Sequence, residues 1–429
     1  GTLYNVLPSG NKAPDETGSH NGYDQTRADF TFSRGSNLAA TRVNSDGLIE
    51  KGRENLLLQS NAFDTTWGKS NVTLTSGHEG YDGTNNAWKL IQTTTAGYHF
   101  ISQSVTSSSL MTLSIYAKAG EYSALSFYQN NASESSVAST FNLSNGTWTT
   151  KNHIAKSTDV GNGWYRLEIV TKDSGTDAYR FYVNQTTQQS EAGDGTSGIY
   201  IQNAQLEKGL VATDYIETGS TTAQAGILED MPRINYDANG ENGALLLEPQ
   251  RTNLCIQSEY AGSWSTAGTG SITENDQISP EGKQNAFTLN DTSSGAYYRI
   301  ERNVSVSAGD NTLSVFLKKT TGALSHYAGV QLDVSRKYVI IDTTSGTWNE
   351  AGSTDNDFID VEDFSDDYWR VIITNNLSAG SRRVALWPAL STDGSSIAVG
   401  ATGENTFYGI QVEAGSYASS YVPTYGSAV

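Results

Sequence analysis

An internal duplication restricts the fold of this chain more than any other feature of its sequence. The segment RENLLLQS (residues 53–60) returns as RTNLCIQS (residues 251–258), and TLSIYAKAG (residues 112–120) returns as TLSVFLKKT (residues 312–320). Three more pairs follow in the same order: SNGTWTT with TSGTWNE, GWYRLEI with DYWRVII, and AQLEKG with IQVEAG. The offsets stay between 198 and 206 residues. A repeat of this length predicts two tandem domains that share one fold.

Composition and periodicity predict that each domain is built from strands. Charged residues make up 17% and hydrophobic residues 36%, and the chain has 42 glycines, which is typical of short strands joined by many turns. In LSIYAKA, Leu113, Ile115 and Ala117 alternate with polar or aromatic residues, and LSVFLKK repeats this pattern with Leu313, Val315 and Leu317. No amphipathic helix longer than two turns is apparent. We therefore expect an all-β fold with two tandem β-sandwich domains of the jelly-roll type.

The expected boundaries follow from the repeat. Residues 1–35 are rich in Gly, Asn, Asp and Ser and predict an irregular N-terminal arm. The first sandwich is expected over residues 36–221 and the second over residues 222–429, with a short linker at residues 217–226. Each has a lead-in, because TRVNSDGLIEKGREN (residues 41–55) is echoed by PRINYDANGENGALLLEPQRTN (residues 232–253).

The charge balance excludes some partners. The formal net charge is −19, which opposes binding to nucleic acid or to an anionic membrane. No stretch approaches the roughly 20 apolar residues of a membrane span. The one cysteine, Cys255, stands where the first copy has Leu57, so we predict a small buried residue and no disulfide framework.

Motifs for catalysis are missing from the sequence. The five histidines stand far apart and predict no zinc site, and no nucleophile elbow or phosphate-binding loop occurs in a suitable context. We predict no catalytic residue, no cofactor and no enzymatic activity. Glu207 and Glu413 each follow a closing strand, and two interpretations stay open for them: a structural Ca²⁺ site, or surface carboxylates that form an ion pair or hydrogen bond, with Arg53 and Arg251 as possible partners.

Comparison of the copies separates scaffold from candidate site. Trp148 with Trp348, Trp67 with Trp264, and Arg166 with Arg370 are shared, so we interpret them as packing and internal hydrogen bonding. Aromatic residues on the polar face of strands could instead stack on sugars, with polar neighbours that bind hydroxyl or acidic groups. The alternative is a subunit or domain interface. The candidate carbohydrate-binding residues are Tyr116, Lys118, Tyr128, Arg166, Glu168 and Tyr182 in the first copy, and Phe316, Lys318, Arg370 and Trp387 in the second.

The repeated strings also carry a family resemblance. NLLLQSNAFDTTW (residues 55–67) and NLCIQSEYAGSW (residues 253–264), each followed by an LSIYAKAG-type strand and a closing QLEKG or QVEAG, resemble jelly-roll modules of the carbohydrate-binding kind. The lead-in FTFSRGSNLAATRVNSDGLIE and the string LLLEPQRTNL (residues 245–254) resemble bacteriophage tail or virion-surface proteins. Calcium-holding relatives carry acidic residues where this chain has Gln59, Gln257, Gln205 and Gln411, which argues against calcium.

This resemblance implies a non-enzymatic virion-surface protein, a tail or head appendage, that binds host or environmental glycans. It further implies that the N-terminal arm contacts other virion proteins, and that the protein is a homo-oligomer, with a trimer suggested by analogy to phage proteins. Two alternatives remain: a structural or decorating protein without glycan binding, and a glycan-active enzyme or its accessory module.

Overall fold

A computed structural model describes residues 41–107, 110–131, 134–150, 154–172, 175–184, 191–228, 231–237, 239–320, 327–390 and 401–429. The expected N-terminal arm, residues 1–35, lies outside these residues. Within them the regular structure is all β, apart from one turn of 3₁₀ helix, η2 (Ala261–Ser263). None of the described residues belongs to a helix long and apolar enough to cross a bilayer.

The chain divides into two compact units, each described here by itself. The first unit is Arg53–Ala225, and the second unit combines residues 41–52 with Gly226–Val429. The predicted boundaries at residues 36 and 222 differ from this division, because the lead-in at residues 41–52 belongs to the second unit rather than to the sandwich that it precedes, and the second unit resumes at Gly226.

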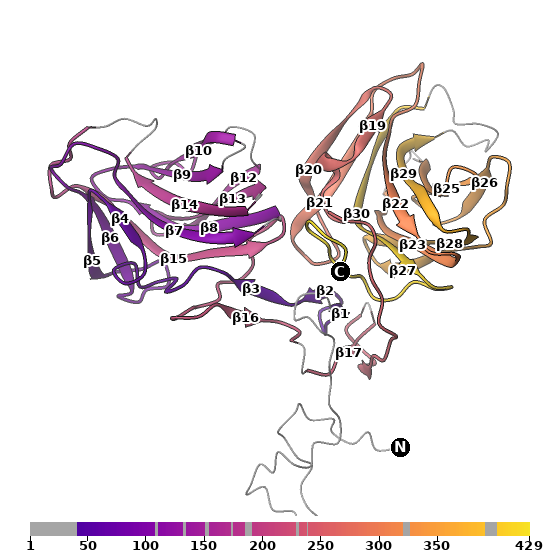
Figure 1. Cartoon of the computed structure of the whole chain (residues 1–429), viewed down its shortest axis with the longest axis horizontal. Helices are drawn as coiled ribbons and strands as arrows, with labels where there is room; N and C mark the ends of the chain where they lie inside the picture. Colours follow the sequence, from indigo (N-terminus) through magenta and orange to yellow (C-terminus); the bar gives the residue numbers. More distant parts are fainter. Residues whose placement is uncertain are drawn as a thin grey trace, which may run out of the picture. The chain divides into compact units, whose positions relative to one another are not determined.

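The first unit contains two six-stranded antiparallel sheets (Figure 1). One sheet, in spatial order, consists of β5 (Val72–His78), β6 (Ala87–Gln92), β15 (Gly198–Lys208), β8 (Leu110–Ala119), β13 (Trp164–Lys172) and β12 (Ile154–Gly161). The other consists of β4 (Gly68–Ser70), β7 (Phe100–Ser107), β14 (Gly175–Val183), β9 (Ala124–Asn131), β10 (Glu134–Asn142) and β11 (Trp148–Thr149). A short pair, β3 (Arg53–Asn55) with β16 (Ala223–Ala225), joins the ends of the unit.

The second unit repeats this arrangement. Its first sheet consists of β20 (Gly270–Ile278), β21 (Gln284–Asp291), β30 (Gly403–Ala414), β23 (Gly309–Lys318), β28 (Tyr368–Leu377) and β27 (Phe358–Ser365). Its second sheet consists of β19 (Ser265–Ala267), β22 (Arg299–Val306), β29 (Gly380–Leu390), β24 (Tyr327–Leu332), β25 (Tyr338–Asp342) and β26 (Trp348–Ala351).

The strand order identifies both units as jelly rolls. In the first unit the central order β6-β15-β8-β13 faces β7-β14-β9-β10, so that consecutive strands mostly alternate between sheets. In the second unit the orders β21-β30-β23-β28 and β22-β29-β24-β25 match them strand for strand. The prediction of two tandem jelly-roll β-sandwiches is therefore confirmed.

Alternating side chains from the two sheets form the core of each unit. Leu113, Ile115 and Ala117 are fully buried between the sheets of the first unit, and their counterparts Leu313, Val315 and Leu317 are fully buried in the second. Burial of each of these leucine, isoleucine and valine side chains stabilises the fold by about 1.5–3 kcal/mol. Trp67, Trp264 and Cys255 also lie in the cores, as predicted.

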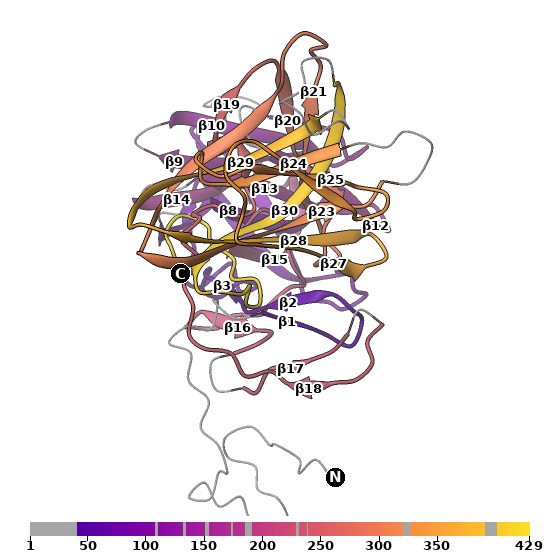
Figure 2. The same cartoon turned by 90° about the vertical axis from the view of Figure 1, so that its right-hand side faces the viewer.

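The lead-in forms a hairpin on the second unit. Its strands β1 (Thr41–Val43) and β2 (Ile49–Lys51) pair antiparallel. Ile49 packs among Phe316 and Tyr408 on the outer face of the sheet that contains β23 and β30, and its N–H donates to the carbonyl of Pro280 at 2.9 Å. The second lead-in, with β17 (Ile234–Asn235) and β18 (Ala244–Leu245), lies beside β1 (Figure 2), where the N–H of Val43 donates to Asn235 Oδ1 at 2.7 Å.

Candidate functional site

Four of the predicted binding residues share the outer face of one sheet in the first unit. Tyr116 and Lys118 lie on β8, opposite Arg166 and Trp164 of β13. The Tyr116 ring stacks on Tyr81 with centroids 3.7 Å apart, and the Arg166 guanidinium lies 5.5 Å from the Tyr116 ring. Burial raises the pKa of Tyr116 to about 12. Glu168 is buried beside them and accepts the N–H of Ala212 at 3.1 Å.

Tyr128 and Tyr182 lie on the opposite sheet of the first unit. Their rings are 5.8 Å apart, and Arg180 lies 5.4 Å over Tyr128 and donates to the Tyr182 hydroxyl at 3.4 Å. Burial is the main cause of the raised pKa of Tyr182. The structure therefore divides the predicted residues of this copy between two opposite surfaces and does not assemble them into one site.

The second unit shows the same division. Phe316 packs against Phe364 at 4.8 Å, beneath the Arg370 guanidinium at 5.6 Å, and Lys318 lies 5.4 Å over the Tyr368 ring. The largest influence on the pKa of Arg370 is desolvation, which lowers it.

Trp387 is remote from that group, because it lies on β29 of the other sheet. Its indole packs against Tyr338 at 5.7 Å, and the Arg299 guanidinium lies 5.8 Å from its ring.

The prediction that these aromatic rings are exposed is wrong. Tyr116, Tyr128, Tyr182, Phe316 and Trp387 are all buried, with at most 9% of any side chain exposed. The physical reason is a second layer of side chains outside the sheets. Ile49 and Tyr421 cover Phe316, and Tyr81 covers Tyr116, so these rings contribute to packing.

Two equivalent tryptophans are exposed instead. Trp148 begins β11 and Trp348 begins β26, which are edge strands of equivalent sheets. Trp148 is 44% exposed and Trp348 is 42% exposed. Exposure of nearly half of each side chain does not fit the interpretation of this pair as packing residues alone, although the Trp148 ring still contacts Phe141 with centroids 6.3 Å apart. Their position directly after a tight turn, SNGTW or TSGTW, is the sequence signal that could have revealed them.

The turn before each tryptophan has the same geometry in both units. The N–H of Gly146 donates to Asn142 O at 2.8 Å, and that of Gly346 donates to Asp342 O at the same distance. Both glycines have φ of 71°, in the left-handed region that favours glycine. A Cβ on Gly146 would lie 2.6 Å from the Tyr165 ring, and one on Gly346 would lie 3.0 Å from Trp369. The turns are thus held tightly against an aromatic ring.

Hydrogen-bonding groups flank the exposed rings. Asn145 Oδ1 accepts the N–H and hydroxyl of Thr147 at 3.0 and 2.7 Å, and the hydroxyls of Ser345 and Thr347 are 2.8 Å apart. All four residues are exposed. We call the tryptophan with its preceding turn the edge platform: residues 145–148 in the first unit and residues 345–348 in the second. Each edge platform combines a rigid exposed indole with polar groups, which suits the apolar face and hydroxyls of a sugar.

The carboxylates Glu207 and Glu413 are buried rather than at the surface, and they act as internal acceptors. Glu207 accepts the N–H and hydroxyl of Thr213, and Glu413 accepts those of Ser419 at 2.8 and 2.6 Å. The expected ion pair is present in the second unit, where Arg251 Nε lies 3.6 Å from Glu413 Oε2. In the described ranges, no group of three or more His, Cys, Asp or Glu residues could hold a metal ion.

A cavity of about 500 Å³ opens between the turn of the lead-in hairpin and the β27–β28 turn of the second unit. Asp46, Asp363, Asp366 and Asp367 contribute to its lining. An acidic sugar would be repelled here, so this cavity does not fit the acidic ligands considered from the sequence.

Comparison with known proteins adds little. No protein-family model matches the chain, and no curated protein matches its sequence. Among solved structures, tomato (Solanum lycopersicum) vicilin matches with 8% identity and a TM-score of 0.13 over 88% of this chain and 84% of that chain. Two mutants of Bacillus subtilis oxalate decarboxylase match with 8% and 7% identity and TM-scores of 0.10 and 0.11, over 84% and 85% of this chain and 80% and 78% of theirs. Similarity this low carries no argument about function.

Proposed function

We propose that the protein is a non-enzymatic surface protein of a bacteriophage particle, a tail or head appendage, that binds glycans through its two jelly rolls. The observation that carries this proposal is the exposure of Trp148 and Trp348 at equivalent positions on equivalent edge strands. Single exposed apolar side chains are common in proteins, so the recurrence of the ring at the same position in both copies, rather than its exposure alone, supports a shared ligand.

The edge platforms fit a neutral saccharide better than an acidic one. The chain carries a formal charge of −19, so a polyanionic glycan would meet long-range repulsion. The polar groups beside each indole are hydroxyls and an amide, from Asn145, Thr147, Ser345 and Thr347. These groups both donate and accept hydrogen bonds, as neutral sugar hydroxyls require.

Avidity supplies the mechanism. A single ring with a few hydroxyls gives a weak, shallow site, but two edge platforms in each chain and several chains in each particle raise the effective concentration of the second contact. In this proposal residues 1–35 anchor the chain to the particle, and the protein is a homo-oligomer, for which we retain a trimer.

The second candidate is a structural or decorating virion protein that binds no glycan. The layer of buried aromatic residues outside both sheets favours it, since Tyr116, Tyr128 and Tyr182 serve packing. In that case Trp148 and Trp348 would contact neighbouring subunits, where tryptophan is also enriched.

A glycan array with the full chain tests the choice. We expect binding to neutral glycans that weakens at least tenfold in Trp148→Ala and Trp348→Ala, while Val334→Ala, which trims another exposed apolar side chain, leaves binding unchanged. A blank array at high protein concentration would instead support the structural candidate. Release of new reducing or unsaturated sugar ends from host polysaccharide would reveal an enzyme and contradict the proposal.

A further inference from the structure

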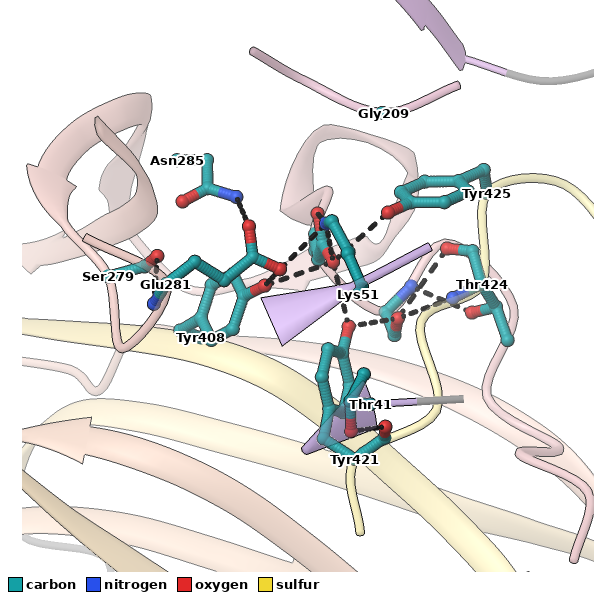
Figure 3. Close-up of polar contacts among 12 residues, drawn as sticks. Thr41, Lys51, Gly209, Ser279, Glu281, Asn285, Tyr408, Tyr421, Thr424 and Tyr425 are labelled. Carbon is teal, nitrogen blue, oxygen red and sulfur yellow. Dashed lines mark hydrogen bonds and ion pairs between the residues drawn. The ribbon is translucent and has the colours of Figure 1, made fainter. Parts of the chain in front are cut away.

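A buried charged cluster fixes the lead-in hairpin to the second unit. Lys51, at the end of β2, places its Nζ 2.7 Å from Glu281 Oε1 and 3.1 Å from Glu259 Oε1. No more than 10% of any of these three side chains is exposed. Figure 3 shows Lys51 among Glu281, Tyr408, Tyr421 and Tyr425.

The amine of Lys51 faces the whole carboxyl group of Glu259. Its Nζ is 3.1 Å from Oε1 and 3.4 Å from Oε2, so the nitrogen is nearly equidistant from both oxygens. The nitrogen therefore lies beside the carboxyl group whose carbon it would attack.

Three tyrosine hydroxyls converge on one oxygen of this carboxyl group. The hydroxyls of Tyr421 and Tyr425 donate to Glu259 Oε1 at 3.2 and 3.5 Å, and the Tyr408 hydroxyl lies 3.0 Å from the same oxygen but directs its one proton to the nearer Glu281 Oε1. Donors aimed at one carboxyl oxygen in a buried site stabilise the negative charge that develops there when a nucleophile adds to the carbon.

Glu281 occupies the position of a general base. Its Oε1 is the acceptor nearest to Lys51 Nζ and also accepts from the Tyr408 hydroxyl, while Asn285 Nδ2 donates to Oε2 at 3.1 Å. Glu281 can therefore take a proton from the ammonium and return it to a leaving group.

The charges in the cluster do not balance when both carboxyls are ionised. One ammonium then faces two carboxylates in a dry site, and burial raises the pKa of Glu259, an effect that the neighbouring Glu281 increases. The Lys51 ammonium opposes this rise in the pKa of Glu259, so burial and Glu281 draw the group toward the neutral acid, the better electrophile, and Lys51 draws it toward the carboxylate. Lys51 stays an ammonium at rest because the carboxylates hold its pKa well above the ordinary value, although burial opposes them. Attack by this nitrogen on the Glu259 carboxyl first requires loss of a proton and is therefore slow.

We propose that Lys51 and Glu259 form an intramolecular amide cross-link. Glu281 removes a proton from the Lys51 ammonium, and the free amine attacks Cδ of Glu259 while the tyrosine hydroxyls hold the developing oxyanion. The C–N bond forms, Glu281 passes its proton to the hydroxyl of protonated Glu259 as the bond from Cδ to that oxygen breaks, and Glu281 then takes the second proton from the nitrogen. An ammonium, a carboxylic acid and the Glu281 carboxylate become an amide, one water molecule and protonated Glu281, so charge and atoms balance without a further reagent.

The cross-link would join two distant parts of the chain covalently, which a disulfide cannot do because the chain has one cysteine. Cys255 is a free buried thiol, whereas the amide would connect residues 208 positions apart. Closing so long a loop lowers the conformational entropy of the unfolded chain and so stabilises the folded state. The bond would also attach the lead-in hairpin covalently to the rest of the second unit.

The first unit offers a matched control. A serine–tyrosine contact beside the cluster is repeated in the first unit. Ser258 Oγ lies 2.6 Å from the Tyr421 hydroxyl in the second unit, and Ser60 Oγ lies 2.5 Å from the Tyr215 hydroxyl in the first. Asn61 stands at the position of Glu259, as the aligned strings LLLQSN and LCIQSE show. This jelly roll is thus built without the carboxyl, so Glu259→Asn is a substitution that the fold accepts in the other copy.

The mass of the intact, purified full chain tests the proposal directly. We expect it to be about 18 Da below the mass calculated from the sequence, which is the loss of one water. Tryptic digestion should yield residues 43–53 joined to residues 252–283, and fragmentation of that product should place the bond at Lys51 and Glu259. A full-length mass without loss, measured fresh and after prolonged incubation, would overturn the proposal, as would a bond placed at Glu281.

Two variants separate the chemistry from folding. Glu259→Asn and Glu281→Gln should both show the full mass, while their circular dichroism spectra stay those of a folded β protein. Persistence of the mass loss in Glu259→Asn would overturn the assigned acyl group, and its persistence in Glu281→Gln would overturn the assigned base.

Discussion

The ring of Tyr81 stacks on the ring of Tyr116, with centroids 3.7 Å apart and planes within 3° of parallel. This contact covers Tyr116 on the outer face of the sheet that contains β8. We predict that Tyr81→Ala exposes Tyr116 and destabilises the first unit by about 1–3 kcal/mol, whereas Tyr81→Phe keeps the stack and costs less than about 1 kcal/mol. Urea unfolding followed by tyrosine fluorescence measures both. Equal losses for the two variants would show that the stack does not stabilise the face.

Trp387 and Trp348 should respond in opposite ways to truncation. Trp387 is fully buried, so Trp387→Ala should destabilise the second unit by about 3–5 kcal/mol, while the exposed Trp348→Ala should stay within about 0.5 kcal/mol. Thermal unfolding by calorimetry distinguishes them. A stable Trp387→Ala protein would contradict the burial assigned to this indole.

The glycine of the second edge platform should not accept a side chain. Gly346→Ala would place a Cβ 3.0 Å from Trp369 on a backbone with φ of 71°, so we expect a loss of about 1–2 kcal/mol and weaker glycan binding. Gly295→Ala is the matched control, because a Cβ there meets nothing within 4 Å. Unfolding midpoints of the two variants test this, and indistinguishable midpoints would contradict the strain assigned to the turn.

Glu274 should make the second unit sensitive to alkaline pH. Burial raises its pKa to about 8, although the Gly262 N–H donates to Oε1 at 2.6 Å. Because the folded pKa lies above the unfolded one, folding favours the protonated acid. Its contribution to stability is complete below the unfolded pKa of about 4.3 and is lost as the pH rises through the folded value.

The side chain of Glu274→Gln stays neutral, so this variant should remove the part of the decline in stability between about pH 5 and pH 9 that comes from Glu274. That part is at most about 1.4 kcal/mol of unfolding free energy for each unit by which the folded and unfolded pKa values differ. The midpoint of urea unfolding at several pH values measures this. A wild-type protein that becomes more stable than the variant as the pH rises would contradict the raised pKa.

The fold could be predicted because its signals are local. Period-two alternation in residues 112–118 and 312–318 identified the inner faces, and the repeated strings identified the two copies. Each inner face is buried by the opposite sheet of its own unit, so the pattern of a single strand was sufficient.

The outer faces could not be predicted because residues remote in sequence cover them. Phe316 was expected to be exposed, but Ile49, from the other end of the chain, packs on it. Lys51 and Glu259 were missed for the same reason, since they approach from segments 208 residues apart. One signal was available: Glu259 replaces the neutral Asn61 of the first copy within an otherwise repeated string.

Titration of the full chain with a neutral oligosaccharide selected on the array tests most directly whether the two copies carry matched sites. We predict two equivalent weak sites in each chain, one site after Trp148→Ala or Trp348→Ala, and none after both. Binding that keeps its stoichiometry in the double variant would contradict the account.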